Sequence, residues 1–237
     1  MEARVDDDFT KPAFRAATLD KFIPRQAILS ALLEQLPSFQ GTVLDLGCGR
    51  MPYKGLVLAA PSRARQYIGM DLKDNIYGKP DLAWDGRTIP LDSNSVECAM
   101  ATEVFEHCPD PQNVMCEILR VLKPRGRLFF TVPFLWPLHD SPHDEYRFTP
   151  FALDRHLRNA RFDQIKMKAL GGWDASLAQM IGLWVRRRPM NKYQRRILSI
   201  LARPLISYLL RRDHPPGVDT DQTMITGIAG SAVKPCP

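Results

Sequence analysis

Apolar residues along the chain follow two spacings in turn, and this predicts strands that alternate with helices. Short apolar runs typical of buried strands occupy residues 42–46, 66–71, 81–85, 95–102, 127–132, 162–170 and 224–233. Helical spacing occurs at residues 24–36, 52–60, 111–122 and 151–159. This order is typical of a doubly wound, mostly parallel sheet, so we predict a seven-stranded α/β fold of one domain. A helical insertion at 173–212 precedes the last strand.

Positive charge is concentrated in that insertion. The chain of 237 residues carries a net charge of +6, and residues 175–212 hold nine Arg and Lys but no Asp or Glu. Apolar residues at helical spacing occupy one side of the same segment, at positions 197, 198, 201, 205, 208 and 209. A basic amphipathic helix suits the surface of an anionic membrane. Two interpretations of residues 173–212 stay open: a helical lid packed on the sheet, with solvated arginines, or a segment in peripheral contact with an anionic membrane. The longest mainly apolar run, 197–210, is too short to span a bilayer.

Cysteine usage and the N-terminal residues bear on the cellular compartment. The five cysteines form no C-x-x-C pair, which is typical of reduced thiols in a cytoplasmic protein. The first eight residues contain no apolar core, so we expect no signal peptide. We therefore expect a cytoplasmic protein, in peripheral contact with the inner face of the membrane if the insertion binds lipid.

The stretch 42–50 ends a buried strand in a glycine turn, Gly47-Cys48-Gly49, preceded by Asp45. Glycines at such a turn let a ligand approach the backbone, at the strand end where α/β sheets bind ligands. A dinucleotide-binding fingerprint requires a third glycine at position 52, where this chain has Pro52, and this disfavours a nicotinamide or flavin enzyme. Asp71 follows Gly49 by 22 residues, near the offset at which such folds place a carboxylate on ribose hydroxyls.

The sequence Val-Leu-Asp-Leu-Gly-Cys-Gly at 43–49 closely resembles the strand and turn of class I S-adenosylmethionine-dependent methyltransferases, in their small-molecule, type 11-like branch. Glu103-Val-Phe-Glu106-His107 and Leu122-Lys-Pro-Arg-Gly126 resemble later patterns of the same superfamily, with Arg125 in place of a glycine. The resemblance implies S-adenosylmethionine as cofactor. It assigns cofactor binding to Asp45, Gly47, Cys48, Gly49, Asp71, Leu72, Asp85, Gly86 and Glu103. For Asp85 the alternative is a simple Asp-Gly turn.

On this resemblance we divide the single domain into four segments. They are an N-terminal arm and helix (1–40), a cofactor-binding core (41–170), the basic helical insertion (171–222), and the last strand with the tail (223–237).

The loop at 133–149 combines aromatic side chains with imidazoles, carboxylates and a cation, as a small-molecule pocket does. We predict His143 as general base, oriented by Asp144 or Glu145, with His139 as its substitute. The predicted substrate contacts are Trp136, Tyr146 and Arg147. In the alternative, Tyr146 and Arg147 tie the loop down and the histidines are surface residues. We interpret His107 as structural.

A metal ion is a minor alternative for the same loop. His139, His143 and Asp144 would be its ligands. No tight ligand spacing supports such a site and methyl transfer does not require one, so we predict no metal.

Three functional hypotheses follow. The favoured one is methyl transfer from S-adenosylmethionine to a hydroxyl of a sugar, glycolipid or related small molecule. The second is methylation of RNA, on ribose or base, suggested by the basic segment. Base N-methylation usually comes with an Asn/Asp-Pro-Pro-aromatic tetrapeptide, and Thr102-Glu-Val-Phe105 stands in its place, so we do not expect base N-methylation. Methylation of ribose or of a non-amino base position stays open, but a nucleic-acid partner is not the favoured one. The third is a non-catalytic S-adenosylmethionine-binding protein. The sequence indicates neither the acceptor nor the oligomeric state.

Overall fold

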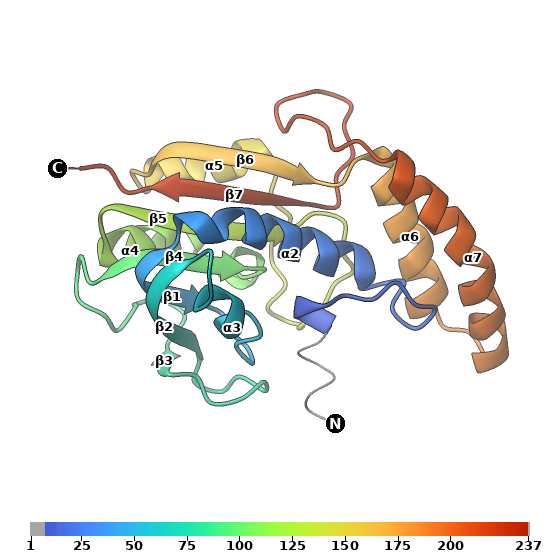
Figure 1. The fold of residues 1–237 in the computed structure, drawn as a ribbon, viewed down its shortest axis with the longest axis horizontal. Helices are drawn as coiled ribbons and strands as arrows, with labels where there is room; N and C mark the ends of the chain where they lie inside the picture. Colours follow the sequence, from blue (N-terminus) through green and yellow to red (C-terminus); the bar gives the residue numbers. More distant parts are fainter. Residues whose placement is uncertain (1–7, 237) are drawn as a thin grey trace.

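Seven strands form one sheet in the order β3-β2-β1-β4-β5-β7-β6 (Figure 1). The structure is a computed structural model that describes residues 8–236; residues 1–7 of the predicted arm and residue 237 of the predicted tail lie outside it. The strands are β1 (Gln40–Leu46), β2 (Arg63–Leu72), β3 (Leu82–Trp84), β4 (Val96–Thr102), β5 (Leu122–Pro133), β6 (Asp163–Leu170) and β7 (Gly227–Val233). This confirms the predicted seven-stranded α/β fold.

The strand order reverses at β1, which pairs in parallel with β2 on one side and with β4 on the other. Leu44 of β1 stands opposite both Ile68 and Ala99. The chain therefore leaves β1 and β4 at the same edge of the sheet and turns away in opposite directions, which opens a crevice there. β7 runs antiparallel to its neighbours β5 and β6, whereas the other described strand pairs are parallel.

Alternate residues of the strands supply two cores on opposite faces of the sheet. Val43 packs with α2 (Phe22–Gln35) and α3 (Lys54–Val57), whereas Leu44 packs with α4 (Pro111–Val121) and α5 (Pro150–Asn159). Figure 1 shows α2 across one face and α4 and α5 on the other. Two 3-10 turns, η1 (Leu36–Ser38) and η2 (Phe105–His107), complete this part.

Two helices, α6 (Trp173–Arg187) and α7 (Lys192–Arg212), form the predicted insertion. They pack against each other beyond the end of the sheet (Figure 1) and meet the segment before α2, where Leu19 packs against Ala178 and Ile206. A Cβ at Gly182 would lie 2.3 Å from the Leu19 carbonyl oxygen, so only glycine allows this approach. Part of the insertion's buried surface meets this N-terminal segment, and Met180, Leu183 and Arg187 of α6 line a cavity at the edge of the sheet, so the lid alternative stays open.

Charge pairing reinforces that contact. The Arg187 Nε lies 2.7 Å from the Asp20 carboxylate, which is almost fully buried.

In the described part of the chain, no helix is both long and apolar enough to cross a membrane.

The insertion leaves and re-enters the sheet at adjacent positions. The Thr226 amide donates to the Leu170 carbonyl at 3.1 Å, and Leu170 stands opposite Gly227 in the β6–β7 pair. The two helices α6 and α7 thus form a long insertion between two neighbouring strands.

Candidate functional site

A cavity of about 440 Å³ lies at the sheet edge where β1, β4 and β5 end. We call it the first cavity. Most of its wall is apolar, and its polar wall residues include Arg25, Asp45, Glu103, His107 and His139. Apolar walls with a few converging polar groups are typical of a small-ligand site.

The glycine turn after β1 forms one wall of the first cavity. Gly47 and Gly49 have φ angles of 68° and 52°, a left-handed conformation that favours glycine. A Cβ at Gly49 would meet only the Tyr77 ring, at 4.0 Å, so the turn presents bare backbone to the cavity. Between the glycines, burial raises the pKa of the Cys48 thiol to about 12, which keeps it protonated.

Asp45 carries an unsatisfied acceptor beside this turn. The side chain is 1% exposed, and the Tyr67 hydroxyl donates to its Oδ2. Its Oδ1 has no hydrogen-bond partner among residues 8–236. Burial raises the pKa of Asp45 to about 7. An unpaired buried oxygen is costly, and a cationic ligand group in the cavity would satisfy it.

Asp71, at the end of β2, is fixed by backbone amides. Its Oδ2 accepts from Gly49 N at 2.8 Å and its Oδ1 accepts from Leu72 N at 2.7 Å. Each carboxylate oxygen can accept a second hydrogen bond, so donors from a ligand can still be bound. The predicted contact of Asp71 and Leu72 with a cofactor stays a prediction.

Asp85 caps a turn, in agreement with the alternative interpretation of Asp85-Gly86 as a simple Asp-Gly turn. Its exposed carboxylate accepts from the Arg87 and Thr88 amides at 2.8 and 2.7 Å, and these bonds hold its pKa below the usual value. The roles of Asp85 and Gly86 in cofactor binding stay predictions.

Arg25 is a cavity residue that the sequence reasoning missed. It projects from the first turn of α2, and its guanidinium lies 3.2 Å from the centroid of the Phe9 ring. Burial lowers its pKa, yet arginine remains charged in proteins. Arg25 therefore offers the first cavity a cation suited to a carboxylate.

Two carboxylates follow β4: Glu103, which is half-buried and lines the first cavity, and Glu106, which is fully buried. Glu103, at φ 56°, accepts from the Thr131 hydroxyl at 2.8 Å, and burial raises its pKa to about 7. Glu106 in η2 has a fully buried side chain, and neither of its carboxylate oxygens has a hydrogen-bond partner in the described chain. Burial, and next the charge of Glu103, raises the pKa of Glu106 well above its usual value.

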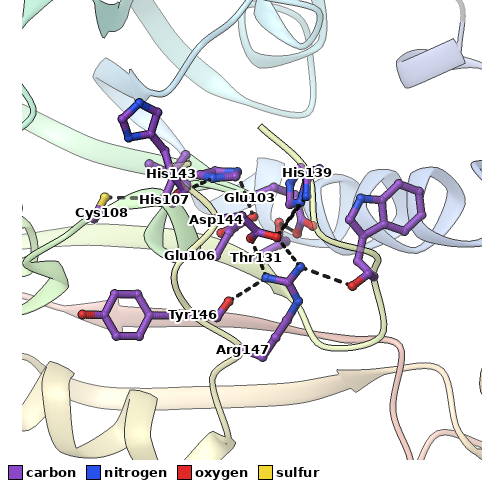
Figure 2. Close-up of polar contacts among 12 residues, drawn as sticks. Glu103, Glu106, His107, Cys108, Thr131, His139, His143, Asp144, Tyr146 and Arg147 are labelled. Carbon is purple, nitrogen blue, oxygen red and sulfur yellow. Dashed lines mark hydrogen bonds and ion pairs between the residues drawn. The ribbon is translucent and has the colours of Figure 1, made fainter. Parts of the chain in front are cut away.

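In the loop at 133–149, Arg147 pairs with Asp144, and Asp144 in turn holds His139. Figure 2 shows the Asp144 carboxylate between His139 and Arg147. The Asp144 Oδ2 lies 3.1 Å from His139 Nδ1, and its Oδ1 lies 2.6 Å from Arg147 Nη1. The hydrogen bonds from Arg147 hold the pKa of Asp144 well below its usual range, so it is ionised. His139 is thereby held in the wall of the first cavity.

His143 lies outside the first cavity, with an exposed side chain. Its backbone carbonyl accepts from His107 Nδ1 at 3.0 Å. The prediction that Asp144 orients His143 is wrong, because that carboxylate is engaged by His139 and Arg147.

The three predicted substrate residues, Trp136, Tyr146 and Arg147, come together in the wall of a second cavity of about 550 Å³. Trp136 also lines the first cavity, so the two spaces adjoin. Tyr146 stacks on Phe148, and Arg147 donates to the Trp136 carbonyl at 3.2 Å. These contacts match the alternative in which both residues tie the loop down; substrate contact stays a prediction.

Among residues 8–236, the side chains that converge with metal-ligand spacing are Glu106, His107 and His139. The set considered from the sequence, His139, His143 and Asp144, does not form, because Asp144 is engaged by Arg147 and the His143 side chain is exposed.

Comparison with known proteins gives one family match and several relatives. Residues 44–130 match the family model described as a methyltransferase domain. A malonyl-[acyl-carrier protein] O-methyltransferase of Alcanivorax borkumensis is 33% identical over 120 residues, which are 46% of this chain and 39% of that protein. The chain spans 34–40% of the length of the curated relatives that it matches.

Solved structures share the fold over most of the chain. A SAM-dependent methyltransferase from Archaeoglobus fulgidus is 16% identical with a TM-score of 0.56, covering 99% of this chain and 100% of that one. The phosphoethanolamine N-methyltransferase 2 of Haemonchus contortus, solved with S-adenosylhomocysteine, is 15% identical with a TM-score of 0.55, covering 98% of this chain and 59% of that one. At these identities the structures show a common fold.

Proposed function

We propose that this chain is a class I S-adenosylmethionine-dependent methyltransferase that transfers a methyl group from S-adenosylmethionine to a hydroxyl of a small polar acceptor. The observation that carries the proposal is the unpaired, buried Oδ1 of Asp45 beside the bare glycine turn. Together they supply an acceptor for an ammonium group and room for a ligand against the backbone.

The polar groups around the first cavity fit the chemistry of this donor. Asp45 would hold the ammonium group and Arg25 the carboxylate of its amino-acid part. Asp71, fixed by the Gly49 and Leu72 amides, would accept from the ribose hydroxyls. When bound, the donor supplies an electrophilic methyl group on a sulfonium. The chain's own residues need only align the acceptor and accept its proton.

The second cavity suits the acceptor. It adjoins the first through Trp136, and α6 contributes Met180, Leu183 and Arg187 to its wall. Aromatic and aliphatic walls with cations bind the apolar and polar faces of a sugar or glycolipid. Activation of the hydroxyl is assigned to the His139 side of the first cavity rather than to the exposed His143. The O-methyltransferase of Alcanivorax borkumensis supports an oxygen acceptor.

Calorimetry with S-adenosylmethionine and S-adenosylhomocysteine tests the donor assignment. Loss of a charge-assisted pair of hydrogen bonds costs roughly 2–3 kcal/mol, so Asp71→Ala should weaken binding about 30- to 160-fold. Asp74→Ala, an exposed carboxylate three residues further on, should bind as the unchanged protein does. Equal affinity of the Asp71 variant, with its fold intact, would contradict the assignment.

The acceptor class is tested with a methyl-labelled donor. Cell-surface glycan, lipid and RNA fractions are incubated with the protein and examined by mass spectrometry. Label in glycan or lipid supports the hydroxyl acceptor, and label confined to RNA supports the second candidate. Donor binding without label in any fraction supports a non-catalytic binding protein.

We also propose that α6 and α7 contact an anionic membrane surface. Both helices expose large apolar side chains at helical spacing, and these are Trp173, Leu177, Met180, Trp184, Tyr193, Ile197, Leu201, Leu205 and Tyr208. Cations flank them, as where the Arg188 guanidinium lies 4.1 Å from the Trp184 ring. Aromatic and basic side chains on one surface suit the boundary of anionic lipids. Because α6 borders the second cavity, this contact would bring a lipid-linked acceptor to the site.

A further inference from the structure

Glu106, His107 and His139 converge at the edge of the first cavity. Their nearest ligand atoms all lie within 4.8 Å of one another, and the two imidazole rings stand 4.7 Å apart, edge to face. The first two residues belong to η2 and the third to the loop after β5, so the fold and not local sequence brings them together.

Hydrogen bonds fix the tautomer of both imidazoles. His107 Nδ1 lies 3.0 Å from the His143 carbonyl oxygen, which only accepts, so this nitrogen carries the proton. His139 Nδ1 lies 3.1 Å from the carboxylate of Asp144, which forms an ion pair with Arg147 and accepts hydrogen bonds, so this nitrogen too carries the proton. In the neutral form of each ring, no residue of the described range 8–236 donates a hydrogen bond to the Nε2 lone pair. An imidazole whose other nitrogen donates to a carboxylate or carbonyl is the usual form of a metal ligand.

Glu106 adds a carboxylate that the protein does not neutralise. Its side chain is fully buried, and no described residue donates a hydrogen bond to either oxygen. Its Oε1 lies 3.7 Å from His107 Nε2, too far for a hydrogen bond. The nearby cation Arg147 is already paired with Asp144. A buried carboxylate in this state needs either a proton or a cation.

We infer that Glu106, His107 and His139 bind one divalent first-row transition-metal ion. Two imidazoles and a carboxylate suit Zn²⁺, Mn²⁺, Fe²⁺ or Co²⁺, whose ligand atoms lie ~3.0–3.4 Å apart around the ion. The Glu106 Oε1 atom lies 3.7 Å from His107 Nε2, and the three ligand atoms lie within 4.8 Å of one another, so the side chains would rotate toward the ion on binding. Three protein ligands leave coordination positions open to the first cavity, whose wall includes both histidines.

The open positions indicate what the ion does. A metal ion binds a hydroxyl oxygen and lowers its pKa. Beside the donor, it would hold the acceptor oxygen in place for methyl transfer. This role rests on the proposed function, whereas ion binding does not.

The test is metal titration of the full chain after stripping with a chelator. Zn²⁺ is followed by calorimetry and Co²⁺ by its visible absorption. We expect one ion per chain, and about 100-fold weaker binding in both Glu106→Gln and His139→Ala, since each loses one of three ligands. Ca²⁺, which prefers oxygen ligands, should bind much more weakly than Zn²⁺.

The matched control is His143→Ala, which removes an exposed imidazole four residues from His139 and keeps the carbonyl that holds His107. It should bind Zn²⁺ as the unchanged protein does. Circular dichroism of each variant reports whether its fold is intact. The inference is overturned if the unchanged protein binds no Zn²⁺ or Co²⁺, or if both ligand variants bind as tightly as the control. If the unchanged protein binds Zn²⁺ but not S-adenosylmethionine, the proposed function is contradicted and the metal site is not.

Discussion

Replacing Asp45 by Asn should stabilise the ligand-free protein and weaken its binding of the donor. The carboxylate is almost completely buried, and one of its oxygens has no partner in the described chain. Asparagine keeps the shape and an acceptor for the Tyr67 hydroxyl but carries no charge. The substitution therefore removes the free-energy cost of burying a charge. It also removes the carboxylate proposed to bind the ammonium group of the donor.

The size of the effect follows from the pKa. Burial raises the folded-state pKa of Asp45 to about 7, from 3.8 for an unperturbed carboxyl. Between these values the folded state binds more protons than the unfolded state, so the free energy of unfolding falls as the pH rises. The cost reaches about 4 kcal/mol above pH 7 and is roughly 2 kcal/mol at pH 5. The stability gained by Asp45→Asn should thus be about 2–3 kcal/mol larger at pH 8 than at pH 5.

Urea unfolding of both proteins at the two pH values measures this difference. Glu103 and Glu106 also have raised pKa values, but they are present in both proteins and cancel in the comparison. Calorimetry completes the assay: affinity for S-adenosylmethionine should rise with pH through 7 in the unchanged protein and stay flat, at least tenfold weaker, in Asp45→Asn. A stability difference that is equal at pH 5 and pH 8 would refute the raised pKa. Unchanged donor affinity would refute the ammonium assignment.

The remaining predictions concern the acceptor side and the helical insertion. His139→Ala should slow methyl transfer about 100-fold with donor affinity unchanged, because it removes a ligand of the ion proposed to hold the acceptor hydroxyl, while His143→Ala keeps its rate; the opposite pattern would restore His143 as the base. The protein should co-sediment with anionic vesicles at low salt and be released by high salt. Arg188→Ala combined with Arg196→Ala should weaken this about tenfold or more, at about 1 kcal/mol per cation, and Arg63→Ala should not. A protein that stays in solution at low salt rules out membrane contact.

The fold was predictable because its signals are local. Short stretches of sequence predict both the strand that ends at the Gly47 turn and the N-terminal cap of α4. That cap is Asp110, whose side chain accepts from the Asn113 amide at 3.0 Å. The turn at Arg125 follows the local pattern less closely. Arg125 stands where the superfamily pattern has glycine and itself adopts the left-handed conformation, at φ 63°. The neighbouring Gly126 cannot be replaced freely either, since a Cβ there would lie 2.7 Å from the Lys123 carbonyl oxygen.

The cavity residues were only partly predictable, because their roles depend on distant partners. His139 and His143 look alike in the sequence, and only the folded loop shows which one Asp144 holds. Arg25 comes from a helix that no motif marks, and it reaches the cavity because α2 crosses the sheet face. Glu106 lay in a recognised pattern, but its lack of a hydrogen-bond partner is visible only once its surroundings are known.

The adjacent exit and return of the helical insertion bear on how such a protein changes its acceptor during evolution. Since Leu170 and Gly227 face each other in the sheet, the chain between them can lengthen, shorten or be exchanged without breaking a bond between strands. The residues proposed to hold the donor, such as Asp45 and Asp71, all precede that junction. Mutations that reshape α6 can therefore be selected for a new acceptor or a new surface while the donor half of the gene stays as it is.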